Sequence, residues 1–198
     1  MRLRCIFLTA TLLLCSAATT QADFITNDFG LTSPEQTIAF DELGLRIDTP
    51  VTNQYLGVTF TDGVFQSPQS LDGLNIFNFD DQWVGNFVDG QTFTNPFSLF
   101  FDTELTDAAF AFISNTGTTE FTALLDGNVV ETFAALTQVT DPNNFFGFEN
   151  IVFDEIRITV DPVTQAAGID NLQFTTVPEP GSSIFCGLLA SVCWRRRR

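Results

Sequence analysis

The sequence predicts an all-β fold, a jelly-roll-like β-sandwich over residues 23–176, between an N-terminal and a C-terminal segment that each contain an apolar run. Short β-rich runs are separated by turn dipeptides. Residues 155–160 alternate polar with apolar side chains, which puts one face in a core and the other in water. No stretch combines helical periodicity with caps at both ends. About ten short strands favour a two-sheet sandwich, and an open barrel is the alternative.

The expected strands end at turn signals such as Asp62-Gly63 and Asp126-Gly127. The clearest hairpin spans residues 120–133, where Asp126-Gly127 or Gly127-Asn128 makes the tight turn. The strands that we expect cover residues 37–40, 57–61, 74–79, 82–88, 97–101, 107–114, 120–125, 129–134, 145–148, 155–160 and 168–174.

The composition of the central domain excludes several chemistries. The chain has no lysine and no histidine, and residues 23–177 hold 23 acidic residues against Arg46 and Arg157, a formal charge of −21. Imidazole bases, Schiff bases and the usual zinc sites therefore cannot form. All four cysteines lie in the terminal segments, so the domain has no disulfide. Nucleic acid is not an expected partner of so acidic a surface, whereas divalent cations are.

The N-terminus has the features of a secretory signal peptide over residues 1–22. Arg2 and Arg4 precede an apolar run, and small residues follow up to Ala22. We expect cleavage after Ala22, with Ala18 as the alternative. Lipidation at Cys15 is disfavoured, because the preceding residue is a leucine where a small residue is required.

The C-terminus, residues 177–198, has three parts in a fixed order. Pro178-Glu179-Pro180 comes first, a mostly apolar stretch over residues 182–194 follows, and the chain ends in Arg195, Arg196, Arg197 and Arg198. This tail resembles the PEP-CTERM sorting signal of bacterial exported proteins. The resemblance implies cleavage by an exosortase-type membrane protease, transient residence in the inner membrane, and delivery to the cell surface or extracellular matrix. The arginines fit a cytoplasmic end, although the mostly apolar stretch has only 13 residues, fewer than the roughly 20 of a spanning helix.

Four stretches of the domain, residues 39–43, 51–60, 145–148 and 168–174, are similar to a pattern of PEP-CTERM surface domains, which resemble carbohydrate-binding-module jelly rolls. In such modules an acidic residue on the last strand often joins one near the first strand to hold a structural calcium ion. The resemblance thus implies a calcium site at Asp170 with Asp41 or Glu42 as partner. Calcium prefers oxygen ligands and needs no histidine or cysteine. Asp170 instead caps a turn or faces solvent if no ion binds.

Two further candidates are weaker. Trp83 is a candidate ligand-binding residue, because an exposed tryptophan ring can stack on a sugar, but a single Trp and the single Tyr55 are more typical of a core. Asp80-Asp81 is expected to be an ordinary acidic turn, since its spacing does not fit an EF-hand. A glycosidase needs a defined carboxylate pair, and no feature of the sequence singles one out.

These observations together predict a non-enzymatic, exported surface or extracellular-matrix protein that its PEP-CTERM tail sorts. The alternative is a carbohydrate-binding module that recognises exopolysaccharide, and a hydrolase is the third possibility. The expected partners are an exosortase-type protease, the inner membrane and extracellular polysaccharide, with structural calcium as the expected cofactor.

Overall fold

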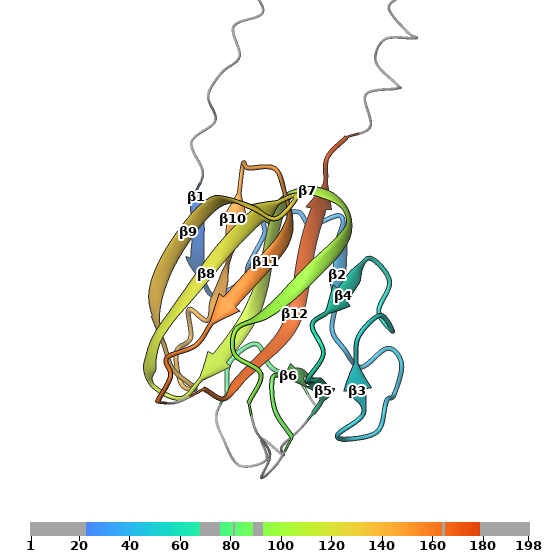
Figure 1. Cartoon of the computed structure of the whole chain (residues 1–198), viewed down its shortest axis with the longest axis vertical. Coiled ribbons are helices and arrows are strands. Elements are labelled where there is room, and N and C mark those ends of the chain that lie inside the picture. The colour runs from blue at the N-terminus through green and yellow to red at the C-terminus, as the bar shows by residue number, and fades with distance from the viewer. Residues whose placement is uncertain (1–22, 68–75, 81, 89–92, 164, 179–198) are drawn as a thin grey trace, which may run out of the picture.

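The computed structural model describes residues 23–67, 76–80, 82–88, 93–163 and 165–178 (Figure 1). The predicted signal peptide and all of the sorting signal beyond Pro178 lie outside these residues. The described part confirms the all-β prediction and holds no helix long and apolar enough to cross a membrane. Its strands are β1 (Asp23–Asn27), β2 (Gln36–Ile38), β3 (Pro50–Val51), β4 (Val58–Phe60), β5 (Val64–Gln66), β6 (Val84–Gly85), β7 (Phe97–Ser114), β8 (Gly117–Leu125), β9 (Asn128–Thr137), β10 (Phe145–Glu149), β11 (Phe153–Thr159) and β12 (Ala167–Thr176).

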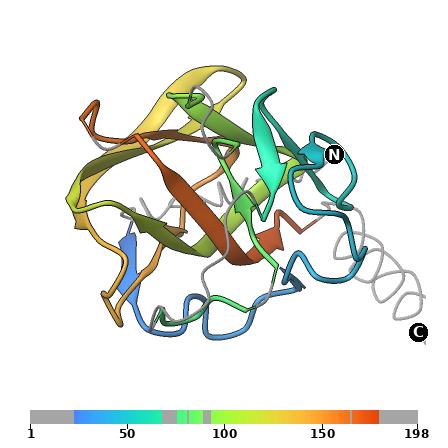
Figure 2. The same ribbon diagram turned by 90° about the horizontal axis from the view of Figure 1, so that it is seen from below.

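The strand β7 takes part in both layers of the sandwich. Its first half pairs with β4 and β11, and the layer continues through β8 to β9. Its second half pairs with β10 and β12, and that layer runs from β1 at one edge to β2 and to β6, β5 and β3 at the other. We call these layers sheet I and sheet II. All the pairings are antiparallel. The views in Figures 1 and 2 agree that β1 and the β3–β5 region lie on opposite sides of the molecule.

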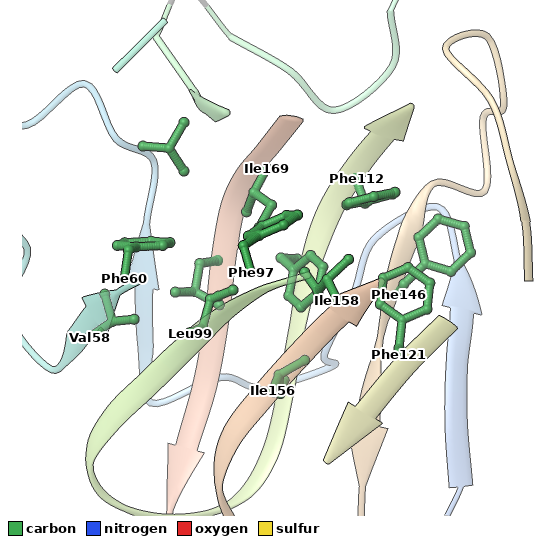
Figure 3. Packing of buried hydrophobic residues seen from close by; sticks show 14 of the residues in the cluster. Val58, Phe60, Phe97, Leu99, Phe112, Phe121, Phe146, Ile156, Ile158 and Ile169 are labelled. Atoms are coloured by element: carbon green, nitrogen blue, oxygen red, sulfur yellow. The ribbon is translucent and has the colours of Figure 1, made fainter. Parts of the chain in front are cut away.

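Phenylalanine rings fill the space between the two sheets (Figure 3). Phe121 of sheet I stacks on Phe146 of sheet II with ring centroids 5.1 Å apart, and Phe112 meets Phe121 edge to face at 5.3 Å. A second, smaller cluster lies on the outer face of sheet II around Ile25 and Leu31. All members of both clusters lie between Ile25 and Phe174, so residues 23–178 carry their own core and are expected to fold alone.

Two local features match the sequence closely. Asp126 and Gly127 both have positive φ, 51° and 75°, and join β8 to β9 as the two-residue turn predicted for this hairpin. In β12 a bulge at Asn171 lets Ile169 and Leu172 both enter the core, while Asp170 lies on the outer face of sheet II. Asn171 adopts φ 47°, a conformation that asparagine tolerates better than most residues.

Other strand predictions need correction. Residues 97–101 and 107–114 belong to one continuous strand, β7, and not to two. Within the predicted strand 74–79, residues 76–79 form a turn, because Asn78 has φ 59° and its side chain bonds to another segment. The sequence analysis missed β1, β3 and β5, which are five, two and three residues long and too short to show a period.

Gly147 of β10 offers a test of the packing between strands. A Cβ atom there would overlap the carbonyl oxygen of Ala108 on β7, a backbone atom that cannot move aside. We expect Gly147→Ala to lower the unfolding free energy of residues 23–178 by about 2 kcal/mol or more in urea titrations. The matched control is Gly127→Ala, where the new Cβ meets nothing within 4 Å. That variant should lose only about 1 kcal/mol, the cost of positive φ for a residue with a side chain. Equal losses in both variants would contradict this account of the sheet.

Candidate functional site

Asp170, the main predicted calcium ligand, is completely buried on the outer face of sheet II. Its two carboxylate oxygens accept hydrogen bonds from separate backbone groups. The N–H of Asp80 donates to Oδ2 at 2.8 Å, and the N–H of Asn171 donates to Oδ1 at 2.7 Å. The bulge at Asn171 makes this arrangement possible, because it turns the N–H of that residue toward the side chain beside it.

Residues 76–80, which we call the covering segment, lie over Asp170. Three further hydrogen bonds fix this segment. Asn171 donates to the Asn78 carbonyl at 2.9 Å, Asn144 donates to the Phe77 carbonyl at 2.7 Å, and Asn78 donates to Asn144 Oδ1 at 2.7 Å. Asp80 is exposed and contributes its backbone to the site, and Asp81 lies outside the described residues. The side-chain amides near β10 and β12 thus take the place of a strand pairing for this segment.

Burial is the main reason that the pKa of Asp170 is raised, to about 7. The two N–H donors oppose that shift, while the charges of Asp80 and Asp41 add to it. Asp41, one of the two residues expected as a calcium partner, therefore lies within electrostatic reach of Asp170. An ionised Asp170 is held by hydrogen bonds but is poorly compensated in charge.

Glu42, the alternative calcium partner, has a different role in the structure. Its Oε1 accepts the Ala39 N–H at 2.7 Å, so it caps the turn that carries Asp41. A buried network supports this turn from behind: Tyr55 Oη lies 2.7 Å from the Phe40 carbonyl oxygen, to which Gln66 Nε2 also donates at 3.0 Å. Burial and the charges of Glu42 and Asp41 raise the pKa of Tyr55, so its hydroxyl stays protonated. Tyr55 is a core residue, as expected.

The carboxylates around Asp170 do not form a preorganised calcium site. Across the described residues, no group of three or more carboxylates or cysteines is placed to hold a metal ion. Asp170 and Glu42 already accept backbone N–H groups, which leaves Asp41 and Asp80 as the carboxylates near Asp170. Calcium at Asp170 therefore stays a prediction that rests on unbalanced charge and not on a preformed site.

Trp83, the predicted sugar-stacking residue, needs correction because its ring is buried, with 3% of its surface exposed. The ring packs over Gly168 of β12, where an added Cβ would lie 2.7 Å from two of the indole carbons. Phe79 and Phe87 flank it, each with a ring centroid 6.2 Å away. Trp83 thus offers no open face to a sugar, and it fills the space that Gly168 leaves on sheet II.

Sequence reasoning missed a polar group on the outer face of sheet I. Glu155 Oε1 accepts hydrogen bonds from Ser98 Oγ at 2.7 Å and from Arg157 at 3.0 Å. The alternation of residues 155–160 places Glu155 and Arg157 on the same face, but Ser98 comes from β7 and could not be found from local spacing. Within the described ranges this is the only ion pair. It fixes a strand pairing and has no second acid or base beside it that would make a catalytic set.

The titration of Asp170 should be visible in the stability of the domain. In the unfolded chain an aspartate has a pKa near 3.9, whereas burial raises the pKa of Asp170 to about 7. The folded state therefore binds the proton more tightly, and this stabilisation is present below pH 4 and lost as the pH rises to 7. We expect the unfolding free energy of residues 23–178 in calcium-free buffer to fall by about 2 kcal/mol between pH 5 and pH 7.5.

Asp170→Asn should flatten that dependence, because the variant has no proton to lose. The chain lacks histidine, so no imidazole obscures this pH range. Glu149→Gln is the control for the other carboxyl whose pKa burial raises. Parallel curves for the parent and Asp170→Asn would show that Asp170 does not titrate in this range.

Comparisons with known proteins add little to the geometry. No protein-family model matches the chain, and no curated protein matches it in sequence. Among solved structures, the chain is similar to CsCBM6-3 from Clostridium stercorarium, described in complex with cellobiose, at 11% identity and a TM-score of 0.33. The match covers 72% of this chain and 94% of that one. At this level of similarity the likeness supports no inference about a ligand.

Proposed function

We propose that this is a non-enzymatic, exported surface or extracellular-matrix protein that an exosortase-type membrane protease releases from a C-terminal anchor. The observation that carries the proposal is the order of three features at the C-terminus: Pro178-Glu179-Pro180, an apolar stretch and four arginines. These features resemble the PEP-CTERM signal, and a signal peptide at the other end would direct the same chain out of the cell.

The fold supports this proposal at the point where the sheet ends. Val177 makes the last backbone hydrogen bond of the described chain there, donating to the Glu104 carbonyl at 3.0 Å. Pro178 follows, is exposed, and has no N–H to extend the pairing. The Pro-Glu-Pro motif therefore begins where the hydrogen bonding of β12 stops, so a protease that acts near it need not unfold the sheet.

Both described ends of the chain also leave the sandwich on the same side (Figure 1). Asp23 of β1 pairs with Glu149, and Thr175 of β12 pairs with Asp107, at the same end of sheet II. A membrane segment attached to either terminus would hold the domain by this one end. The opposite end, which includes the β5 and β6 region, would point away from the membrane.

Replacement of Pro178-Glu179-Pro180 by three alanines should leave an uncleaved precursor in the membrane, because the protease loses its recognition motif. In the parent protein, mass spectrometry of the surface form should place the C-terminus near residue 178. A control that alters Val163, which is exposed on a loop, should be processed normally. Recovery of an intact Arg198 terminus from the mature surface protein would exclude sorting by this tail.

Recognition of exopolysaccharide was the alternative function, with Trp83 as its ligand-binding residue. Because Trp83 is buried against Gly168, no observation favours that function over the one proposed. Polysaccharide enters the proposal as the material of the matrix into which the protein is delivered.

Calcium at Asp170, with Asp41 as partner, is the second part of the proposal. A divalent cation would compensate the charges that raise the pKa of Asp170, and calcium tolerates backbone oxygens as its remaining ligands. Calcium should therefore stabilise residues 23–178 more than magnesium does, by about 1.4 kcal/mol at tenfold saturation. Thermal melts measure the difference, and Asp170→Ala should remove the calcium-specific part. Equal shifts from both ions in the parent and the variant would leave only general charge screening.

A further inference from the structure

Three carboxylates stand in one row across the end of sheet II from which the chain ends emerge. Asp23 on β1 lies opposite Glu149 on β10 in the strand register. Phe148 lies opposite Ala108 on β7, so the next pair in the antiparallel register is Glu149 with Asp107. The inward positions of Phe148 and Ala108 put Glu149 and Asp107 on the outer face, and Asp23 is on the same face as Ile25. We call Asp23, Glu149 and Asp107 the acidic row.

The acidic row is unfavourable as it stands. Like charges directly opposite each other destabilise a sheet. Burial and the charges of Asp107 and Asp23 raise the pKa of Glu149 accordingly. Asp107 is partly relieved, since its oxygens accept the Asn150 N–H at 2.9 Å and the Thr106 hydroxyl at 2.6 Å. Over the part of the chain that the structure describes, the sole ion pair is Arg157 with Glu155, in the other sheet, so no arginine neutralises the row.

The position of the row coincides with a second, independent feature. Asp23, which lies in β1, is the residue that the sequence predicts as the first of the mature protein. Signal-peptide cleavage after Ala22 would convert the uncharged amide nitrogen of Asp23 into an ammonium group. The strand register places Asp23, which carries that nitrogen, opposite Glu149. In a chain without lysine or histidine, this ammonium would be one of three cationic groups in residues 23–177, with Arg46 and Arg157.

We propose that the α-ammonium group of Asp23, released by signal-peptide cleavage, forms an ion pair with Glu149 and neutralises the acidic row. The precursor lacks this charge, so the end of sheet II reaches its full stability only after export. The inference rests on the proposed export of the protein. Cleavage would then have a second effect besides removing the signal peptide, because it would supply the positive charge that neutralises the acidic row.

The absence of lysine makes the test unusually clean, because the α-amine is then the only primary amine in residues 23–178. We would measure the rate at which an N-hydroxysuccinimide ester acetylates this amine as a function of pH, which gives the pKa of the amine directly.

The charged groups that face the amine are the side chains of Asp23 itself, Glu149 and Asp107. Because Asp23 is exposed, we expect the reagent to reach the amine. The amine of the parent should have a pKa about half a unit or more above that in Glu149→Gln. Glu120→Gln, an exposed position on β8 of the other sheet, is the matched control and should not change it.

Thermal melts provide the second readout at low salt. The fragment with a free amine at Asp23 should melt about 2 °C above the acetylated fragment and above one that retains Gln21-Ala22. In Glu149→Gln this difference should disappear. Equal amine pKa values in the parent and Glu149→Gln, or equal melting temperatures with the amine free and blocked, would overturn the proposal. Determining the N-terminal residue of the protein purified from its own cells distinguishes failure of the ion-pair proposal from failure of the export proposal. A mature chain that begins at Thr19 would overturn the ion pair, because Asp23 would then have no free amine, but it would leave the export proposal intact.

Discussion

Backbone N–H groups, and not cationic side chains, hold many of the carboxylates of this domain. With 23 acidic residues and two arginines in residues 23–177, charge pairing can serve very few of them. Main-chain nitrogens donate to six of these carboxylates, from Asp80 to Asp170, Asn150 to Asp107, Ala39 to Glu42, Asn143 to Asp141, Val163 to Asp161 and Thr176 to Glu35. Because an N–H is fixed to the backbone, each of these bonds also fixes a turn or a strand end. The shortage of cations thus links the charge of the domain to its loop conformations.

The phenylalanine core opposes the repulsion that this charge creates. Phe121 packs against Phe112, Phe146 and Phe133, rings that come from both sheets. The two sheets cannot slide apart without breaking β7, which pairs in each of them. A continuous strand and a layer of aromatic rings therefore join the two sheets of a domain that contains no cysteine.

How far the sequence predicted this structure depends on whether the determining contact is local. The turn at Asp126-Gly127 follows from residue types over a few positions, and this prediction is confirmed. Trp83 illustrates the opposite case, since its burial depends on the missing side chain of Gly168, on a strand far along the chain. Asp170 was expected to be a calcium ligand with Asp41 or Glu42 as partner. Its main partner, the N–H of Asp80, was not predicted, because the covering segment was expected to be a strand.

The two buried or half-buried carboxyls with raised pKa, Asp170 and Glu149, mark the places where N–H donors do not suffice. Asp170 has two donors and still titrates near neutral pH, because hydrogen bonds offset only part of the cost of burial. Glu149 faces two acidic neighbours across the strands on either side of it. Such sites require either a proton or an external positive charge. In a lysine-free domain the available sources are a metal ion and the chain's own amino terminus, and the two sites differ in which one the backbone brings near. Asp23, the first residue of β1, lies opposite Glu149, whereas Asp170 is buried beside the covering segment in the first half of β12.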